Sequence, residues 1–162
     1  MTKRKVYFDS CVFIAYLHKK HKNHKDALDS LKVIKEFETM EAYSSEWAIN
    51  EMIKVLVKDY HYPKKKAETI AEKIFKESSI AGIELKWANP DSDSKYTFKE
   101  FFKHITSQLM DIKSIHLADA IHSIIMINNN IDCIFTTNGD DFRGLKTFTV
   151  LEPRQILALS GK

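Results

Sequence analysis

The sequence predicts an α/β fold in which helices cover both faces of a mainly parallel β-sheet. Short apolar runs typical of buried strands alternate with longer amphipathic segments typical of helices. Strands separated by helices need crossover connections, which place neighbouring strands parallel to one another. The length of 162 residues fits one sizeable core, so we expect a single domain over residues 1–162.

The first half of the chain predicts two strand–helix units with an extra helix between them. Ser44 and Ser45 are both good N-cap residues for the helix that follows the second strand. The expected elements are a buried strand at 6–8, a short helix at 12–16, an amphipathic helix at 26–37, a strand at 42–43 and a largely apolar helix at 46–60.

The second half continues the alternation. Pro63 opens a helix, and the period-two pattern of residues 83–87 indicates a strand. The further elements are a helix at 64–78, a loop at 89–94, helices at 97–110 and 114–129, strands at 131–136 and 148–151, and a terminal helix after Pro153.

Composition excludes few functions. The formal charge of +3 permits nucleic-acid binding without arguing for it. The sequence has neither the long apolar run of a membrane span nor the unbroken apolar region of a signal peptide, so we expect a cytoplasmic protein. Cys11 and Cys133 lack metal-ligand spacing and are interpreted as buried free thiols.

Two acidic residues stand at positions that favour a functional site. Asp9 follows the first strand directly, at the carboxyl edge of the predicted sheet, although a helix cap would explain it equally well. Glu51 lies within the largely apolar helix, where a buried carboxylate needs a partner. A metal ion would supply that partner, and so would a buried Lys or Arg.

Two further segments bring carboxylates near the same edge. Asp119 lies in an early turn of its helix, where the helix dipole alone would also explain a carboxylate. His116 and His122 flank it at three residues on either side, and solvated histidines are the commoner case. The segment 136–142, which follows the most convincing strand, contains Asp140 and Asp141, which a simple surface turn would also accommodate.

The four segments together predict one oxygen-rich site. Carboxylate oxygens are the ligands that Mg²⁺ and Mn²⁺ prefer in proteins. Such ions orient and activate water and neutralise charge on a phosphodiester, so the pattern favours phosphodiester hydrolysis.

In these segments the sequence resembles PIN-domain proteins of the VapC-like group. The resemblance spans nearly the whole chain and rests on the order of four short motifs, which are VYFDS at 6–10, SS at 44–45 with NE at 50–51, LADAIH at 117–122 and TTNGDDF at 136–142. It implies a three-layer α/β/α sandwich and a metal-dependent ribonuclease. It also implies metal ligation and catalysis by Asp9, Glu51, Asp119 and Asp141, with support from Ser10, Thr136, Asn138 and Asp140.

The sequence departs from the family pattern at two positions. Cys11 stands where the family usually has a small polar residue, so we expect a supporting contact to be missing. Asn138 occupies a position that is often Asp, which leaves open whether Asp141, Asp140 or Asn138 is the fourth ligand.

The expected partners are RNA, a second copy of the chain and, by the resemblance, an antitoxin. The basic stretch 18–25 offers Lys19, Lys20, Lys22 and Lys25 to an RNA backbone, and a solvated loop explains it equally well. Large apolar residues of the helices at 26–37 and 46–60, among them Phe37, Trp47, Met52 and Leu56, favour a homodimer. The alternative functions are a non-catalytic PIN-like module that binds RNA or protein, and a phosphohydrolase acting on small phosphates.

Overall fold

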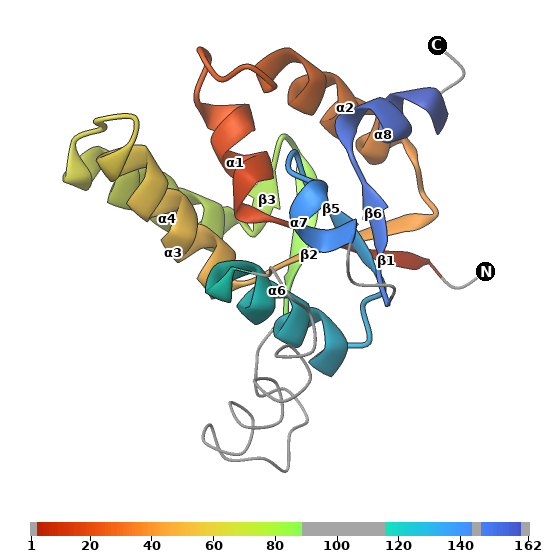
Figure 1. The fold of residues 1–162 in the computed structure, drawn as a ribbon. Coiled ribbons are helices and arrows are strands. Elements are labelled where there is room, and N and C mark those ends of the chain that lie inside the picture. Colours follow the sequence, from red (N-terminus) through yellow and green to blue (C-terminus); the bar gives the residue numbers. More distant parts are fainter. Residues whose placement is uncertain (1–2, 89–115, 144–146, 160–162) are drawn as a thin grey trace.

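The computed structural model describes residues 3–88, 116–143 and 147–159, and its strands form one six-stranded sheet (Figure 1). The sheet order is β3-β4-β2-β1-β5-β6, and every neighbouring pair is parallel except β3–β4. The strands are β1 (Arg4–Phe8), β2 (Met40–Ser44), β3 (Ser79–Ile80), β4 (Ile83–Trp87), β5 (Cys133–Phe135) and β6 (Thr149–Leu151).

Helices cover both faces of this sheet, which confirms the predicted three-layer α/β/α fold. They are α1 (Ser10–Leu17), α2 (His24–Glu36), α3 (Glu46–Lys58), α4 (Lys64–Glu77), α6 (Leu117–Asn128), α7 (Asp140–Arg143) and α8 (Pro153–Leu159). One apolar core contains side chains of α1, α2, α3, α4 and α8, and a second contains side chains of α6 and α7.

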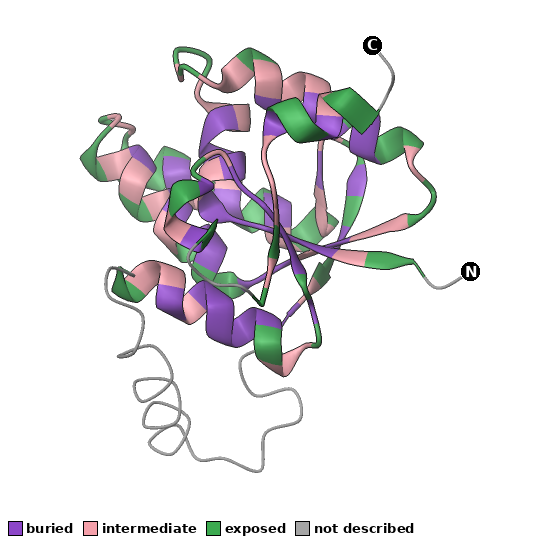
Figure 2. Ribbon diagram, turned by 45° about the vertical axis from the view of Figure 1, so that its right-hand side comes forward, coloured by how far each residue is buried: buried purple, intermediate pink, exposed green. Residues whose placement is uncertain are grey.

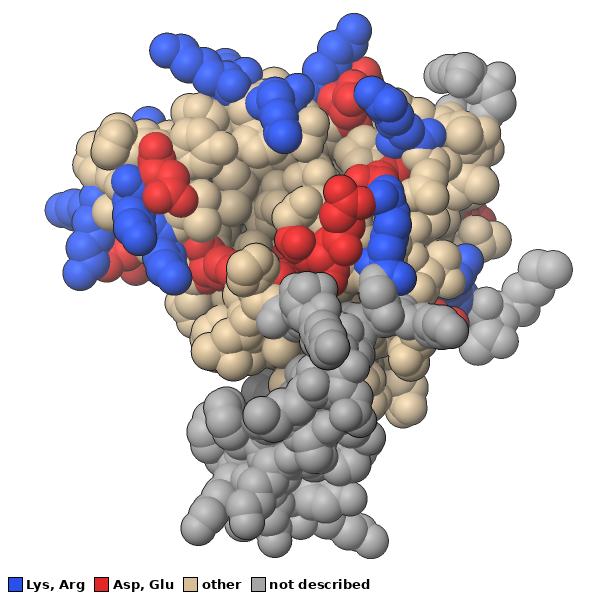
Figure 3. Space-filling view, viewed as in Figure 1, with Lys and Arg blue, Asp and Glu red and all other residues tan. Residues whose placement is uncertain are grey.

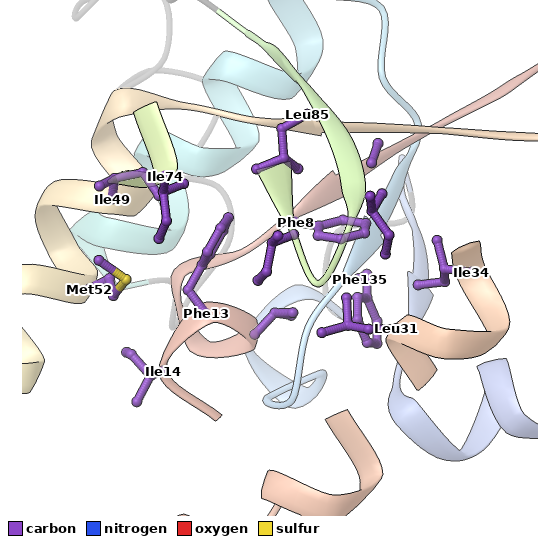
Figure 4. Close-up of a cluster of buried hydrophobic side chains, with 14 of the residues drawn as sticks. Phe8, Phe13, Ile14, Leu31, Ile34, Ile49, Met52, Ile74, Leu85 and Phe135 are labelled. Carbon is purple, nitrogen blue, oxygen red and sulfur yellow. The ribbon is translucent and has the colours of Figure 1, made fainter. Parts of the chain in front are cut away.

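The alternation of side chains along β1 separates these two cores. Val6 and Phe8 point into the larger core, whereas Tyr7 points into the smaller one, and all three are fully buried. Phe8 packs edge-to-face on Phe135 of the neighbouring strand, at a centroid distance of 5.4 Å (Figure 4). Figure 2 shows the buried strands crossing the middle of the molecule between partly exposed helices.

The central position of β1 determines which chain segments meet at the carboxyl edge. β1 pairs with β2 on one side and with β5 on the other, with Phe8 opposite Phe135. The backbone N–H of Asp9 donates to the carbonyl of Phe135 at 3.2 Å. The residues that follow β1 and β5, Asp9 and Thr136, therefore lie side by side although 127 positions separate them.

Most predicted elements are present, and the exceptions have local causes. β3 has two residues and α7 has four, so neither is long enough to show a period in the sequence. Ser45, and not Ser44, caps α3 by accepting from the N–H of Ala48 at 3.2 Å. The predicted loop at 89–94 and helix at 97–110 lie outside the described residues, as does the start of the helix predicted at 114–129.

The prediction that α3 is buried nearly all round was wrong. Met52 and Leu56 are fully buried against the sheet, whereas Trp47 is 37% exposed. Met52 and Leu56 are therefore core residues and no longer support a dimer interface. No helix among the described residues has the length and apolar character needed to cross a bilayer.

Candidate metal centre

Asp9 is a buried carboxylate whose two oxygens are held by different neighbours. It is 5% exposed and caps no helix N–H, although it stands at the N-cap position of α1. One oxygen, Oδ2, accepts from Thr136 Oγ1 at 2.8 Å and from Cys11 Sγ at 2.9 Å, while Oδ1 accepts from Ser10 Oγ at 3.2 Å. Asp9 is thus not the simple helix cap that its position would also allow.

Glu51 reaches the same place from α3. Its Oε2 atom accepts from Ser10 Oγ at 2.7 Å and contacts His122 Nε2 at 2.9 Å. Burial alone would raise the pKa of Glu51, but the hydrogen bonds with His122 and Ser10 outweigh burial and place the pKa below its usual value. Ser10, which contacts both Asp9 and Glu51, links the two carboxylates.

Asp119 lies in the first turn of α6, half-buried and close to the other acids. Burial, followed by the charges of Asp141 and Asp9, raises the pKa of Asp119 to about 6, and the charge of Glu51 adds to this. The charges of the three other predicted ligands thus all act on Asp119. The side chains predicted as ligands on four separate elements therefore lie in one electrostatic neighbourhood.

The polar residues of the segment that follows β5 make different contacts. Thr136 Oγ1 holds Asp9 and also accepts from the backbone N–H of Asn138 at 3.0 Å. The Asn138 amide donates to Asp141, which acts on Asp119 through its charge. Asp140 is turned away, with an 83% exposed side chain paired with Arg143. Of the three candidates for the fourth ligand, Asp141 is therefore the one whose charge acts on Asp119, and Asn138 donates to it.

His122 is the residue that the sequence interpretation missed. Its side chain is fully buried, with Nε2 at 3.3 Å from Asp9 Oδ1 as well as at 2.9 Å from Glu51. The hydroxyl of Tyr7 contacts Nδ1 at 2.8 Å and Ser45 Oγ at 2.6 Å. His116, by contrast, is exposed, as expected of a solvated histidine.

A helical-face argument would have found His122. It lies three positions before Ile125 and four before Met126, both of which are buried apolar residues of α6. Burial alone would lower the pKa of His122, but the bond to Glu51 and the charges of Asp9 and Glu51 outweigh it and raise the pKa. The imidazole is therefore held as a donor between the two carboxylates.

The expected loss of a supporting contact at Cys11 was wrong. Cys11 Sγ lies 2.9 Å from Asp9 Oδ2, 3.1 Å from Thr136 Oγ1 and 3.1 Å from the backbone nitrogen of Thr137. Burial, reinforced by the charge of Asp9, raises the pKa of Cys11 well above its usual value. The neutral thiol fills the position of a small hydroxyl because sulfur reaches the same neighbours.

This donor set fits a divalent cation. Ligand atoms of Asp9, Glu51 and His122 lie within 4.8 Å of one another, whereas the predicted ligands Asp119 and Asp141 are not part of that group and interact with it through their charges. Carboxylate oxygens suit Mg²⁺ and Mn²⁺, and an imidazole nitrogen is more typical of the transition metals. Figure 3 shows acidic side chains gathered near the centre of this face, with basic side chains along its upper and left-hand margins.

The four predicted RNA-binding lysines do not join this cluster. Lys19, Lys20 and Lys22 belong to the connection between α1 and α2, and Lys25 lies in the first turn of α2. All four are exposed.

Comparison with solved structures finds chains of the same fold, although the sequence matches no protein-family model and no curated protein. The chain is similar to VapC20 of Mycobacterium tuberculosis, described as a sarcin-ricin loop cleaving toxin, with a TM-score of 0.58 and 12% identity over 84% of this chain and 92% of that one. It is similar to VapBC-1 from nontypeable Haemophilus influenzae (TM-score 0.59, 12% identity, 93% and 98% covered). It is also similar to FitAcB from Neisseria gonorrhoeae (TM-score 0.56, 14% identity, 92% and 98% covered).

Proposed function

Because the chain has the fold of the VapC-like PIN domains, we propose that it is a Mg²⁺- or Mn²⁺-dependent endoribonuclease that hydrolyses phosphodiester bonds in RNA. The observation that supports the proposal is the group formed by Asp9, Glu51 and His122, with the charges of Asp9, Glu51 and Asp141 all acting on Asp119. Burial, followed by the charges of Asp141 and Asp9, raises the pKa of Asp119 to about 6. A bound divalent cation would remove the repulsion between these charges, and it would orient and activate water and neutralise charge on the phosphodiester.

We assign the metal-holding role to Asp9, Glu51, Asp119 and Asp141. Ser10 and Thr136 orient Asp9 through their hydroxyls, and Asn138 orients Asp141 through its amide. These hydrogen bonds matter because a carboxylate that rotates freely binds a small, rigidly coordinated ion less tightly and in a less defined geometry.

His122 is assigned a positioning role between Asp9 and Glu51. Its ring is fixed by the hydroxyl of Tyr7 on one side and contacts both carboxylates on the other. The charge that it lends to the cluster also lowers the cost of burying two carboxylates near each other.

The biological role that fits best is the toxin of a toxin–antitoxin pair, acting in the cytoplasm. VapC20 is described as a toxin that cleaves the sarcin-ricin loop, which is the observation that favours RNA as the substrate. An antitoxin would inhibit by placing a basic side chain, such as Arg, among the carboxylates in place of the metal. We also propose that the chain acts as a homodimer.

A nuclease assay tests the proposal. The wild type and Asp119→Asn are incubated with end-labelled RNA and DNA oligonucleotides in EDTA, in Mg²⁺ and in Mn²⁺. We expect RNA cleavage by the wild type with metal only, and none by the variant. Cleavage that persists in EDTA would refute a metal mechanism. Binding of RNA without cleavage under all three conditions would favour the non-catalytic module.

A further inference from the structure

A second feature of the surface lies apart from the acidic cluster, at the far end of α1. It is a pocket of about 450 Å³ between the α1–α2 connection and the start of α4. Its lining combines three lysines with aromatic and aliphatic side chains, namely Leu17, His18, Lys19, Lys20, Tyr62, Lys66 and Ile70.

The positive charge of this pocket is uncompensated. Lys19, Lys20 and Lys66 form no ion pair with any residue in the described part of the chain. A neighbouring pocket of about 680 Å³ differs, because its Lys32 pairs with Asp29 and its Lys73 pairs with Glu77. Uncompensated lysines around a hollow favour an anionic ligand.

The local field supports this conclusion. Burial, followed by the positive charges of His18, Lys22 and His24, lowers the pKa of His21 at the edge of the same connection. The first turn of α4 contains three consecutive lysines, Lys64 to Lys66, and no acidic residue. Cations there are opposed by the helix dipole, so this arrangement costs stability and favours anion binding instead.

Aromatic rings border the lysines. The ring of His18 lies 4.0 Å from that of Tyr60, tilted by 37°, and meets that of Tyr62 edge-on at 5.9 Å. Lys66 Nζ lies 5.1 Å from the centre of the Tyr62 ring. Lysines interleaved with aromatic rings are the combination that binds phosphates and stacks bases in proteins that hold single-stranded nucleic acids.

The pocket is held at a fixed distance from the carboxylates. α1 begins with Ser10, beside Asp9, and ends at Leu17, in the pocket wall. Its eight residues span about 12 Å at about 1.5 Å per residue. At about 3.4 Å per nucleotide in a stacked strand, and more in an extended one, this distance corresponds to about two to four nucleotides.

We propose that this pocket is a docking site for single-stranded RNA. It holds a nucleotide two to four positions away from the phosphodiester bond that is cleaved at the acidic cluster. Lys19, Lys20 and Lys66 contact its phosphates, and the ring of Tyr62 offers a surface for its base. The inference rests on the proposed function, since it takes RNA as the ligand. It predicts that Lys19 and Lys20 contribute more to RNA binding than Lys22 and Lys25, which do not line the pocket.

Binding of a fluorescein-labelled U12 RNA, followed by anisotropy in EDTA so that no cleavage occurs, tests the inference. Lys20→Ala/Lys66→Ala is compared with Lys58→Ala/Lys76→Ala, which removes two exposed lysines that do not line the pocket. The pocket variant should bind at least fivefold more weakly. In a plot of the logarithm of the binding constant against the logarithm of the salt concentration, the magnitude of the slope should decrease by about 1.4, at about 0.7 per lost contact. The control variant should stay within twofold of the wild type.

A second comparison tests the base contact. Tyr62→Leu should weaken U12 binding severalfold, whereas Tyr62→Phe, which keeps the ring, should bind like the wild type. Thermal melting of each variant verifies that it is folded. Equal losses in the two lysine variants, or no loss in either, would overturn the inference.

The outcomes separate the two proposals. If the wild type cleaves RNA with metal while the pocket variants bind U12 like the wild type, the docking inference is wrong and the proposed function stands. If the wild type cleaves nothing but U12 binding still depends on Lys20, Lys66 and Tyr62, the nuclease proposal is wrong and the docking site stands.

Discussion

Nε2 of His122 lies 2.9 Å from Oε2 of Glu51 inside the molecule, although 71 positions separate the two residues. His122 belongs to α6, which contributes to the smaller core, and Glu51 belongs to α3, which contributes to the larger core. The contact joins a base to an acid at a site where several carboxylates would otherwise repel one another.

Replacing Asp9 with Asn should abolish cleavage without unfolding the protein. The substitution keeps the shape of the side chain but removes a ligand charge, so cleavage should fall by about 100-fold or more. Because the metal-free carboxylates repel one another, the melting temperature in EDTA should stay unchanged or rise by about 2–4 °C. Asp132→Asn, at an exposed position, is the control and should change neither quantity. Full cleavage by the Asp9 variant would sink the metal mechanism.

Tyr7→Phe should destabilise the fold through the buried hydrogen bonds it removes. The Tyr7 hydroxyl joins His122 Nδ1 to Ser45 Oγ, so its loss should cost about 1–3 kcal/mol. Tyr43→Phe is the matched control, because that hydroxyl contacts Glu41 of the same strand at a part-buried position and its loss should cost less than about 0.5 kcal/mol. Urea denaturation measures both, and equal costs would contradict the assignment of a buried network.

The metal-free protein should become more stable as the pH falls from about 8 to 5. The folded-state pKa of Asp119, about 6, lies above its ordinary value of 3.8, and that of His122 is raised above its ordinary value of 6.5. Both groups bind protons more tightly when folded, so their stabilisation is complete below the unfolded pKa and is lost as the pH rises through the folded pKa. Thermal melting in EDTA across this range measures the effect. A melting temperature that falls on acidification from pH 8 to 5 would contradict it.

Saturating Mn²⁺ should reverse this trend, because the cation binds ionised carboxylates and competes with protons. Mn²⁺ should then raise the melting temperature more at pH 8 than at pH 5.5.

Cys11→Ser should preserve metal binding, whereas Cys11→Val should weaken it. A serine hydroxyl can still donate to Asp9, but a valine leaves Oδ2 with Thr136 as its remaining side-chain donor. We expect an approximately tenfold loss of Mn²⁺ affinity for the valine variant, the order found for lost supporting contacts. A Mn²⁺ titration followed by electron paramagnetic resonance measures this directly. Equal affinities would show that the thiol only fills space.

Light scattering at micromolar concentration should give about twice the monomer mass of 18.8 kDa. The exposed Trp47 and Leu117 remain as apolar side chains available for such an interface, since Met52 and Leu56 are used in the core. A clean mass of 18.8 kDa would count against the dimer.

The sequence by itself determined the layer order and the four acidic motifs of this protein. Buried parallel strands are short and uniformly apolar, and their helices show a 3.6-residue period, so both can be recognised locally. Asp9 and Thr136 could be placed at the carboxyl edge for the same reason, because each follows directly on a strand.

Only the tertiary structure decided which polar residues complete the site. The helical face that His122 shares with Ile125 and Met126 could have shown that it is buried, but nothing near it in the sequence shows that Tyr7 and Glu51 approach it from other elements. The contacts of Cys11 and the separation of Asp141 from Asp140 likewise depend on how α7 and the β5 edge meet α1. Hydrogen bonds between distant segments follow from strand order and register, and these are set by the packing of the whole sheet and leave no local pattern in the sequence.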